Sequence, residues 1–193
     1  TLSSSSAASD VYKRQYLNSS EEVLMKNLNS FILNNTVKVL DFIYSDRHLQ
    51  RFWVLEVIAR SPYFAFLSVL HFKESLGIKN DTTMFLMKEH FYQAINETEH
   101  LKEMEKRGGD KFWIDRFLAR HLVLVYYWIM VIYYFCSPTN AYDVNIKIEE
   151  HAFNTYTKYL KTHPEDQKIK EIAQDELNHV EELNEALAMI TQS

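Results

Sequence analysis

Two short motifs carry the residues best suited to bind a metal. Glu97 and His100 lie three positions apart, and Glu176 and His179 repeat the same Glu-x-x-His spacing. On an α-helix, residues at i and i+3 face the same way, so each motif can direct a carboxylate and an imidazole at one cation. Such pairs also arise by chance on helix surfaces, so their weight depends on the residues that accompany them.

Two further glutamates complete a repeated order along the chain. Glu56 precedes the first motif and Glu149 precedes the second. The order Glu then Glu-x-x-His, given twice on four helices, is the inward-facing ligand set of a carboxylate-bridged di-iron bundle. Four carboxylates with two imidazoles suit iron or manganese and do not suit a structural zinc site. The alternative is that the carboxylates form salt bridges, for which the candidate partners are Arg51, Arg60 and Lys147.

Composition restricts the fold and the partners. The 193 residues suffice for one domain with a sizeable core, and only three Gly and three Pro leave little material for the turns of a sheet. A net charge of -5 without a basic patch argues against nucleic acid. The single cysteine, Cys136, excludes an intrachain disulfide framework and cysteine-based metal sites.

Hydrophobic periodicity predicts an all-α fold of about six helices. We expect a Ser-rich tail over residues 1–15, either non-native or disordered, and a single domain over residues 16–193. We expect Ser45-Asp46, Asn80 and Asp81, and Asp110 to cap the second, third and fourth helices, and Pro62 to cause a kink or local turn in the second. The helices are expected at about 21–44, 46–77, 81–107, 111–136, 138–161 and 166–190.

The fourth helix contains an uncharged apolar run from Leu122 to Cys136. This run has about fifteen residues, whereas a membrane span needs about twenty. We therefore expect this helix to be too short to cross a bilayer. Its aromatic, apolar character favours contact with a membrane surface or a partner subunit.

Longer motifs resemble the alternative oxidases, most closely their plastid branch, the plastoquinol terminal oxidases. LEVIARSPYFAF at 55–66 resembles that branch's LETIARVPYFAF, and NETEHL at 96–101 resembles its NEMHHL. GG…WIDRFLARH over 108–121 and EEHAFNTY at 149–156 are similar to its GG…WFDRFLAQH and VESHAYETY. DELNH at 175–179 is similar to its DDEAEH. The connection between Tyr156 and Asp175 is shorter than is usual in the family.

The resemblance implies a four-helix di-iron carboxylate bundle with additional membrane-associating helices. It implies a membrane-associated quinol:oxygen oxidoreductase, using ubiquinol or plastoquinol, that holds two Fe ions and reduces O2 to water without proton pumping. Tyr156 is the implied catalytic residue, and Asn96 and Asp175 are the implied hydrogen-bonding pair behind the ligands. The implied metal ligands are Glu56, Glu97, His100, Glu149, Glu176 and His179; the implied quinol pocket is Arg51, Leu55, Ala152 and Thr155.

The same resemblance implies a monotopic homodimer attached to one leaflet of a thylakoid or other photosynthetic membrane. Two other readings of the residues stay open at this point. One is a soluble di-iron protein, either a ferritin-like oxidase or a ribonucleotide-reductase-like subunit. The other is a non-enzymatic, membrane-associated helical protein with degenerate ligands.

Overall fold

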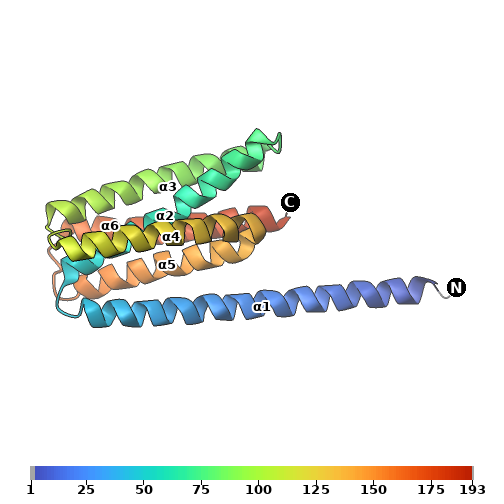
Figure 1. The fold of residues 1–193 in the computed structure, drawn as a ribbon, viewed down its shortest axis with the longest axis horizontal. Helices are drawn as coiled ribbons and strands as arrows, with labels where there is room; N and C mark the ends of the chain where they lie inside the picture. Colours follow the sequence, from blue (N-terminus) through green and yellow to red (C-terminus); the bar gives the residue numbers. More distant parts are fainter. Residues whose placement is uncertain (1–2, 193) are drawn as a thin grey trace.

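The polypeptide folds into six α-helices joined by short connections (Figure 1). This computed structural model describes residues 3–192, with side chains described from residue 23 onward. No strand occurs within residues 3–192, and the all-α prediction is confirmed. The helices are α1 (Ser3–Ile43), α2 (His48–Ser75), α3 (Asp81–Lys106), α4 (Trp113–Cys136), α5 (Pro138–Leu160) and α6 (Gln167–Gln192).

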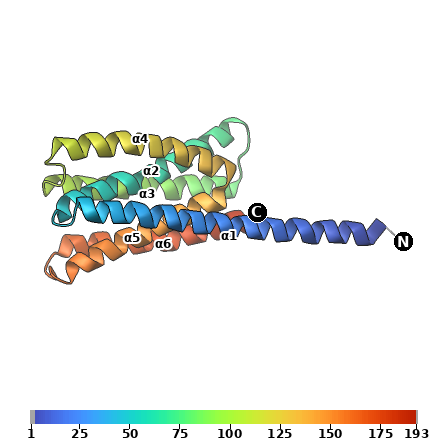
Figure 2. The same ribbon diagram turned by 60° about the horizontal axis from the view of Figure 1, so that its bottom comes forward.

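Four of these helices form a bundle. Within it α2 packs on α3, α5 on α6, α3 on α6 and α2 on α5. Helix α4 lies outside the bundle against α2 and α5, and α1 lies along α5 (Figure 2). The predicted bundle with additional helices is therefore confirmed.

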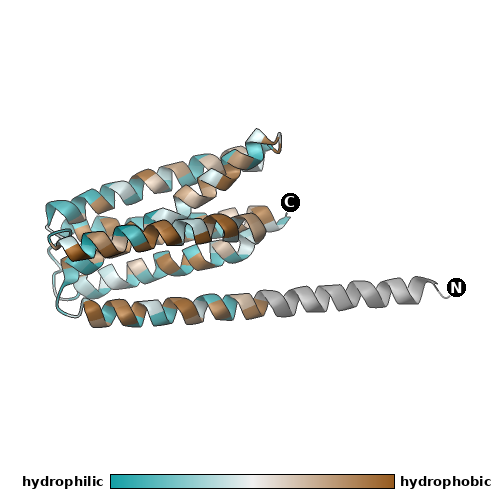
Figure 3. Ribbon diagram, viewed as in Figure 1, coloured by the Kyte–Doolittle hydropathy of each residue, from teal (hydrophilic) through white to brown (hydrophobic). Residues whose placement is uncertain are grey.

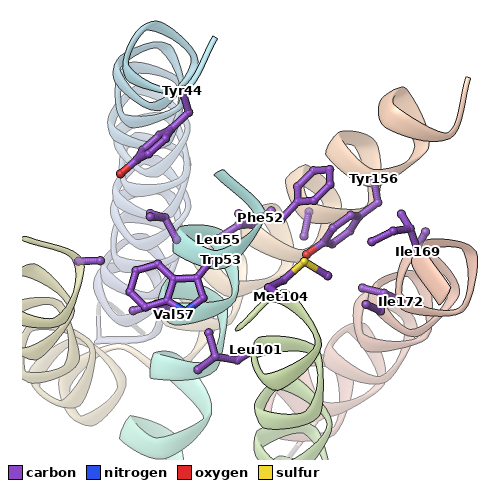
Figure 4. Close-up of a cluster of buried hydrophobic side chains, with 14 residues drawn as sticks. Tyr44, Phe52, Trp53, Leu55, Val57, Leu101, Met104, Tyr156, Ile169 and Ile172 are labelled. Carbon is purple, nitrogen blue, oxygen red and sulfur yellow. The ribbon is translucent and has the colours of Figure 1, made fainter. Parts of the chain in front are cut away.

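Two buried apolar clusters fill the bundle. The first includes Trp53 and Met104 (Figure 4), and the second includes Phe66 and Leu183. Along α2, Glu56 lies between Trp53 of the first cluster and Phe66 of the second. Along each of the other inner helices, the candidate ligands likewise lie between a member of one cluster and a member of the other. Each large apolar side chain that is fully buried contributes about 1.5–3 kcal/mol to folding. The apolar packing therefore encloses the polar centre on both sides.

Helix α2 continues through Pro62 without a break, so the local turn that was one of the two expected outcomes is wrong, and the kink stays a prediction. Proline removes one backbone hydrogen bond from a helix interior and opposes the preceding turn sterically. The flanking residues Ser61 and Tyr63 are both buried, and Tyr63 belongs to the second cluster. Tertiary packing on both sides of Pro62 offsets the lost hydrogen bond.

Of the three predicted N-terminal helix caps, one is confirmed and two are wrong. Asn80 caps α3, since its Oδ1 accepts from the Thr83 amide at 2.8 Å, as predicted. The expected caps at Ser45-Asp46 and Asp110 are wrong: α2 and α4 begin after Arg47 and Phe112, and neither side chain makes a capping bond. Arg47 instead pairs with buried Asp115 of α4, and this pair joins the start of α2 to the start of α4.

Helix α4 is longer than its uncharged run. It has 24 residues, about 36 Å at 1.5 Å per residue, because it extends back through Arg120 to Trp113. By length and composition α2 and α4 could both cross a membrane, although the most apolar window is 72% buried in α2 and only 11% buried in α4. The expectation that the fourth helix is too short to cross a bilayer is therefore wrong.

Helix α1 is longer than the predicted 21–44 and includes most of the segment 1–15. Residues 1 and 2, and the side chains of residues 1–22, lie outside what the structure describes. The assignment of 1–15 as a tail separate from the domain stays a prediction.

The short connection between α5 and α6 is held by an arginine at the end of α3. Arg107 donates from both terminal nitrogens to Asp166, at 2.6 and 3.0 Å, and from Nε to Glu103 at 2.9 Å. Asp166 Oδ1 also accepts from the Ile169 amide at 3.2 Å and so caps α6. One bidentate pair thus fixes where α6 begins, even with few residues in the connection.

Candidate metal centre

Six buried side chains from α2, α3, α5 and α6 meet at the middle of the bundle. They form two groups of four whose ligand atoms lie within 4.8 Å of one another. Both groups contain Glu97 and Glu176, so these two carboxylates stand between the groups. The first group adds Glu56 and His100, and the second adds Glu149 and His179. None of the six is more than 4% exposed.

The two Glu-x-x-His pairs face each other across the bundle. His100 directs Nδ1 at Glu176 Oε1, 3.3 Å away, and at Glu56 Oε2, 3.6 Å away. His179 directs Nδ1 at Glu97 Oε1, 2.9 Å away. The two imidazole rings are 6.3 Å apart. Each histidine thus contacts a carboxylate of the opposite motif.

The ligand atoms have few partners other than one another. Both oxygens of Glu97 and of Glu176 are buried without a hydrogen-bond donor, as is Oε2 of Glu56 and of Glu149. Unpaired carboxylates in a dry interior cost several kcal/mol each. Two divalent cations would balance the four negative charges of these four carboxylates, so the residues fit a two-metal centre.

The pKa shifts in the cluster indicate that its four carboxyl groups do not all ionise without a bound cation. Burial, followed by repulsion from Glu97, raises the pKa of Glu56 and of Glu176 to about 8, and burial raises the pKa of Glu149 well above its ordinary value. Burial also opposes ionisation of Glu97, but the nearby imidazoles of His179 and His100 hold its pKa below the ordinary value. Without metal, the cluster keeps protons on most of its carboxyls.

Two tyrosines hold the outer glutamates in a reciprocal arrangement. The Tyr156 hydroxyl of α5 donates to Glu56 Oε1 on α2. The Tyr63 hydroxyl of α2 donates to Glu149 Oε1 on α5 at 2.7 Å. Both tyrosines are 0% exposed. Each lies seven residues after the glutamate of its own helix, a spacing that returns to the same helix face. The family resemblance predicted a role for Tyr156 and none for Tyr63, which this spacing could have found.

Asn96 and Asp175 lie behind His100. The Nε2 of His100 donates to Asp175 Oδ2 at 3.1 Å, and Asn96 Nδ2 donates to the same oxygen at 3.5 Å. Metal-binding histidines commonly donate their second ring nitrogen to a carboxylate, which fixes the tautomer and leaves the other nitrogen free for the metal. The predicted pair therefore has the geometry that orients Nδ1 toward the centre.

The predicted quinol-pocket residues lie on adjoining faces of α2 and α5. Leu55 and Ala152 are buried next to the centre, and Thr155 is half-buried. Arg51 pairs with Asp41 of α1 and donates from Nη2 to His151 Nε2 at 3.1 Å. His151, which the sequence left without a role, also lies 3.3 Å from Thr155 Oγ1. Because arginine can only donate, the Nε2 of His151 is an acceptor here and the imidazole is neutral.

The salt-bridge alternative fails for the described side chains. Arg51 pairs with Asp41, Lys147 pairs with Asp143, and Arg60 stacks over the Phe64 ring. Among residues 23–192, no ion pair joins any of these three cations to the six buried residues. The carboxylates are therefore left to one another and to whatever cation they bind.

Comparison with known proteins agrees with this centre. The family model described as "Alternative oxidase" matches residues 10–182, and the chain belongs to the alternative oxidase family. It is 44% identical over 145 residues to "Ubiquinol oxidase 4, chloroplastic/chromoplastic" of Arabidopsis thaliana, which covers 75% of this chain and 41% of that protein. It is 28% identical over 140 residues to "Ubiquinol oxidase 2, mitochondrial" of Glycine max, covering 70% of this chain and 41% of that protein.

The chain spans about two fifths of the length of these curated relatives. No solved structure gives a significant match to it. The family is a di-iron family, which agrees with the buried carboxylate and histidine cluster.

Proposed function

We propose that this chain is a membrane-associated quinol:oxygen oxidoreductase with two irons. The observation that carries the proposal is the pair of four-residue groups that share Glu97 and Glu176. Membership of the alternative oxidase family supports the same reading. The relatives named ubiquinol oxidases indicate the class of substrate.

In this proposal Glu97 and Glu176 would be shared between the two metal sites. Glu56 and His100 complete one side, and Glu149 and His179 complete the other. Bound iron supplies the electron transfer to O2, which organic side chains cannot perform. The protein residues fix the ligand geometry and exclude bulk water, since none of the six ligands is more than 4% exposed.

The tyrosines hold protons at defined atoms. Each hydroxyl donates to the non-bridging glutamate of the helix opposite, Tyr156 to Glu56 and Tyr63 to Glu149. Tyr156 is the proposed catalytic residue, because its hydroxyl contacts Glu56 and it directly follows the proposed quinol-pocket residue Thr155 on α5. Its phenol holds a proton at the Glu56 carboxylate and is placed to transfer it.

The quinol head is proposed to bind where Arg51, His151 and Thr155 meet. In this proposal these side chains form the polar end of the quinol site, and Leu55 and Ala152 form its inner wall. Each quinol releases two electrons and two protons, so two quinols supply the four electrons and four protons that convert one O2 to two waters. Both half-reactions occur on one side of the membrane in this arrangement, which provides no proton pumping.

Membrane attachment is proposed through α4, with α1 beside it. Apart from Arg120 and His121, the exposed residues of α4 are apolar, and the helix is largely brown in Figure 3. If α4 crossed the bilayer, the inner helices that run beside it would carry exposed charges into the hydrocarbon, including Lys102 of α3 and Glu181 of α6. Attachment to one leaflet avoids this cost. Exposed apolar residues of α4 include Trp113, Phe117, Leu122, Val125, Trp128, Ile129 and Ile132.

The proposed setting is a thylakoid or other photosynthetic membrane, with the chain as a homodimer. The chloroplastic name of the Arabidopsis relative supports a plastid location. Dimerisation rests on the family resemblance and would cover part of the exposed apolar surface.

Oxygen uptake by the purified protein in detergent, against ubiquinol and plastoquinol analogues, tests the activity. We expect two quinols oxidised for each O2 consumed. Glu97→Ala should lose iron and activity together, while Glu99→Ala, on the exposed side of the same helix, should keep both. Iron binding without quinol oxidation in the parent would point instead to another kind of di-iron protein.

A further inference from the structure

A polar cleft opens between α3 and α6 and ends at the buried centre. Its volume is about 180 Å³, and its walls include Gln93 and Asn96 of α3 and Asp175, Asn178, His179 and Glu182 of α6. His179 is only 4% exposed, and its Nδ1, which has no hydrogen-bond partner, lies 2.9 Å from Glu97 Oε1. One imidazole therefore forms the wall between the cleft and the metal-binding carboxylates.

A buried hydrogen-bonded chain fixes the carboxylate at the mouth of the cleft. His90 is 0% exposed; its Nε2 accepts from the Tyr142 hydroxyl at 2.6 Å and its Nδ1 donates to Gln93 Oε1 at 2.8 Å. Gln93 is 2% exposed and donates from Nε2 to Glu182 Oε2 at 2.9 Å. Burial lowers the pKa of His90 to about 4, consistent with the neutral ring that this pattern requires. No ligand to the centre takes part in this chain, so the metal-binding geometry does not explain it.

Oxygen atoms continue inward from the mouth. Asp175 has a partly exposed side chain in the cleft while its Oδ2 contacts His100 Nε2. Oδ1 of Asn96 is buried and has no donor. Carboxylate and amide oxygens of this kind are the hard ligands that a hydrated divalent cation exchanges for its waters. The cleft therefore provides oxygen ligands for a cation at successive positions from Glu182 inward to His179.

The opposite side of the bundle does not offer such a path. There α4 lies on α2 and α1 lies on α5, and most of the exposed residues of α4 are apolar. A hydrated cation would have to lose its waters against apolar side chains on that side. Because the six ligands are almost fully buried, iron needs a route from solvent to reach them.

We propose that the α3–α6 cleft is the route by which Fe²⁺ enters the centre, with Glu182 as its first protein ligand. This proposal rests on the proposed function in one respect, that the centre binds iron. Glu182 and Asp175 attract the ion, Asn96 and Asn178 supply further oxygens, and His179 moves aside and then binds. The cleft residues other than His179 are not part of the final ligand set, so they act on the rate of loading and not on the amount of iron bound.

The test measures the rate of Fe²⁺ uptake by the iron-free protein in detergent without oxygen. Asn178→Lys places a positive charge in the cleft, and Asn184→Lys places the same charge on the exposed surface of α6 away from it. A unit charge about 6 Å from a divalent ion in water slows its passage by about tenfold at low salt. We expect this slowing in Asn178→Lys only. We expect a smaller slowing in Glu182→Gln than in Asn178→Lys, and none in the control Glu181→Gln.

Final iron content separates the outcomes. The proposal expects every variant to reach the parent's iron content when given enough time. Parental loading rates in both Asn178→Lys and Glu182→Gln would overturn it, as would a reduced final content in either, because that would place the residue in the ligand set. Failure of the parent itself to bind iron would instead contradict the proposed function.

Discussion

Removing the iron should make the protein's stability fall as the pH rises. The pKa of Glu56 and of Glu176 is 4.5 when unfolded and about 8 in the folded, metal-free centre. Between these values the folded state keeps a proton that the unfolded chain releases, so folding stability is highest near pH 4.5 and decreases up to pH 8. The slope is about 1.4 kcal/mol per pH unit for each carboxyl. The raised pKa values of His100 and His179 act in the same direction.

From pH 5 to pH 7 one such carboxyl therefore costs about 3 kcal/mol, and the two together at most about 6 kcal/mol. For a domain of this size, 1 kcal/mol corresponds to about 2–4 °C in Tm. Thermal unfolding of the iron-free protein, followed by far-ultraviolet circular dichroism in one detergent, should give a Tm at least about 5 °C lower at pH 7 than at pH 5.

Two controls make this result specific to the centre. Iron-loaded protein should show the opposite trend, since the ligands must lose their protons to bind metal. Glu56→Gln should weaken the trend in the iron-free protein, because its amide has no proton to release. An iron-free Tm that is constant or rises between pH 5 and pH 7 would refute the electrostatic account of the cluster.

Three further predictions concern the tyrosine, the connection and the membrane face. Tyr156→Phe should keep iron and fold, because it removes no ligand and little volume, but should lose most quinol oxidation; iron content and oxygen uptake check this. Arg107→Gln should lower stability by about 1–2 kcal/mol in denaturant unfolding. The Arg107 hydrogen bond lowers the pKa of Asp166 below 3.8, so that stabilisation is lost only as the pH falls below about this value. Ile129→Glu should weaken binding to lipid vesicles in a flotation assay without lowering Tm, since this side chain is 55% exposed.

Each of these predictions has a matched control. Tyr159→Phe, one turn further along α5, should keep full turnover, and equal turnover in Tyr156→Phe would remove Tyr156 from the mechanism. Lys106→Gln, beside Arg107 but mostly exposed, should leave stability unchanged. Ile95→Glu on α3 should float like the parent, and unchanged flotation of Ile129→Glu would exclude α4 as the membrane face.

The sequence predicted the helices and the six buried residues because their signals are local. Glu-x-x-His places two ligands on one helix face by spacing alone, and Asn80 caps α3 through an amide three residues away. The longer family motifs then extended the prediction to Asp175, which contacts His100, and to Asn96, which contacts Asp175.

What the sequence missed depends on contacts between helices. The bond from Tyr63 to Glu149 joins residues 86 positions apart, although the Glu56–Tyr63 spacing repeats that of Glu149 and Tyr156. The pairing of Arg107 with Asp166 likewise requires that α3 end beside the α5–α6 connection. The expected turn at Pro62 was wrong for the same reason, since helix packing outweighs a local preference.

Iron X-ray absorption of the purified, iron-loaded protein tests the central claim most directly. If Glu97 and Glu176 bridge two metals, the spectrum should contain an iron–iron distance of about 3–4 Å, with oxygen and imidazole ligands and two irons per chain. A single iron per chain with no iron–iron vector would contradict the shared-carboxylate centre.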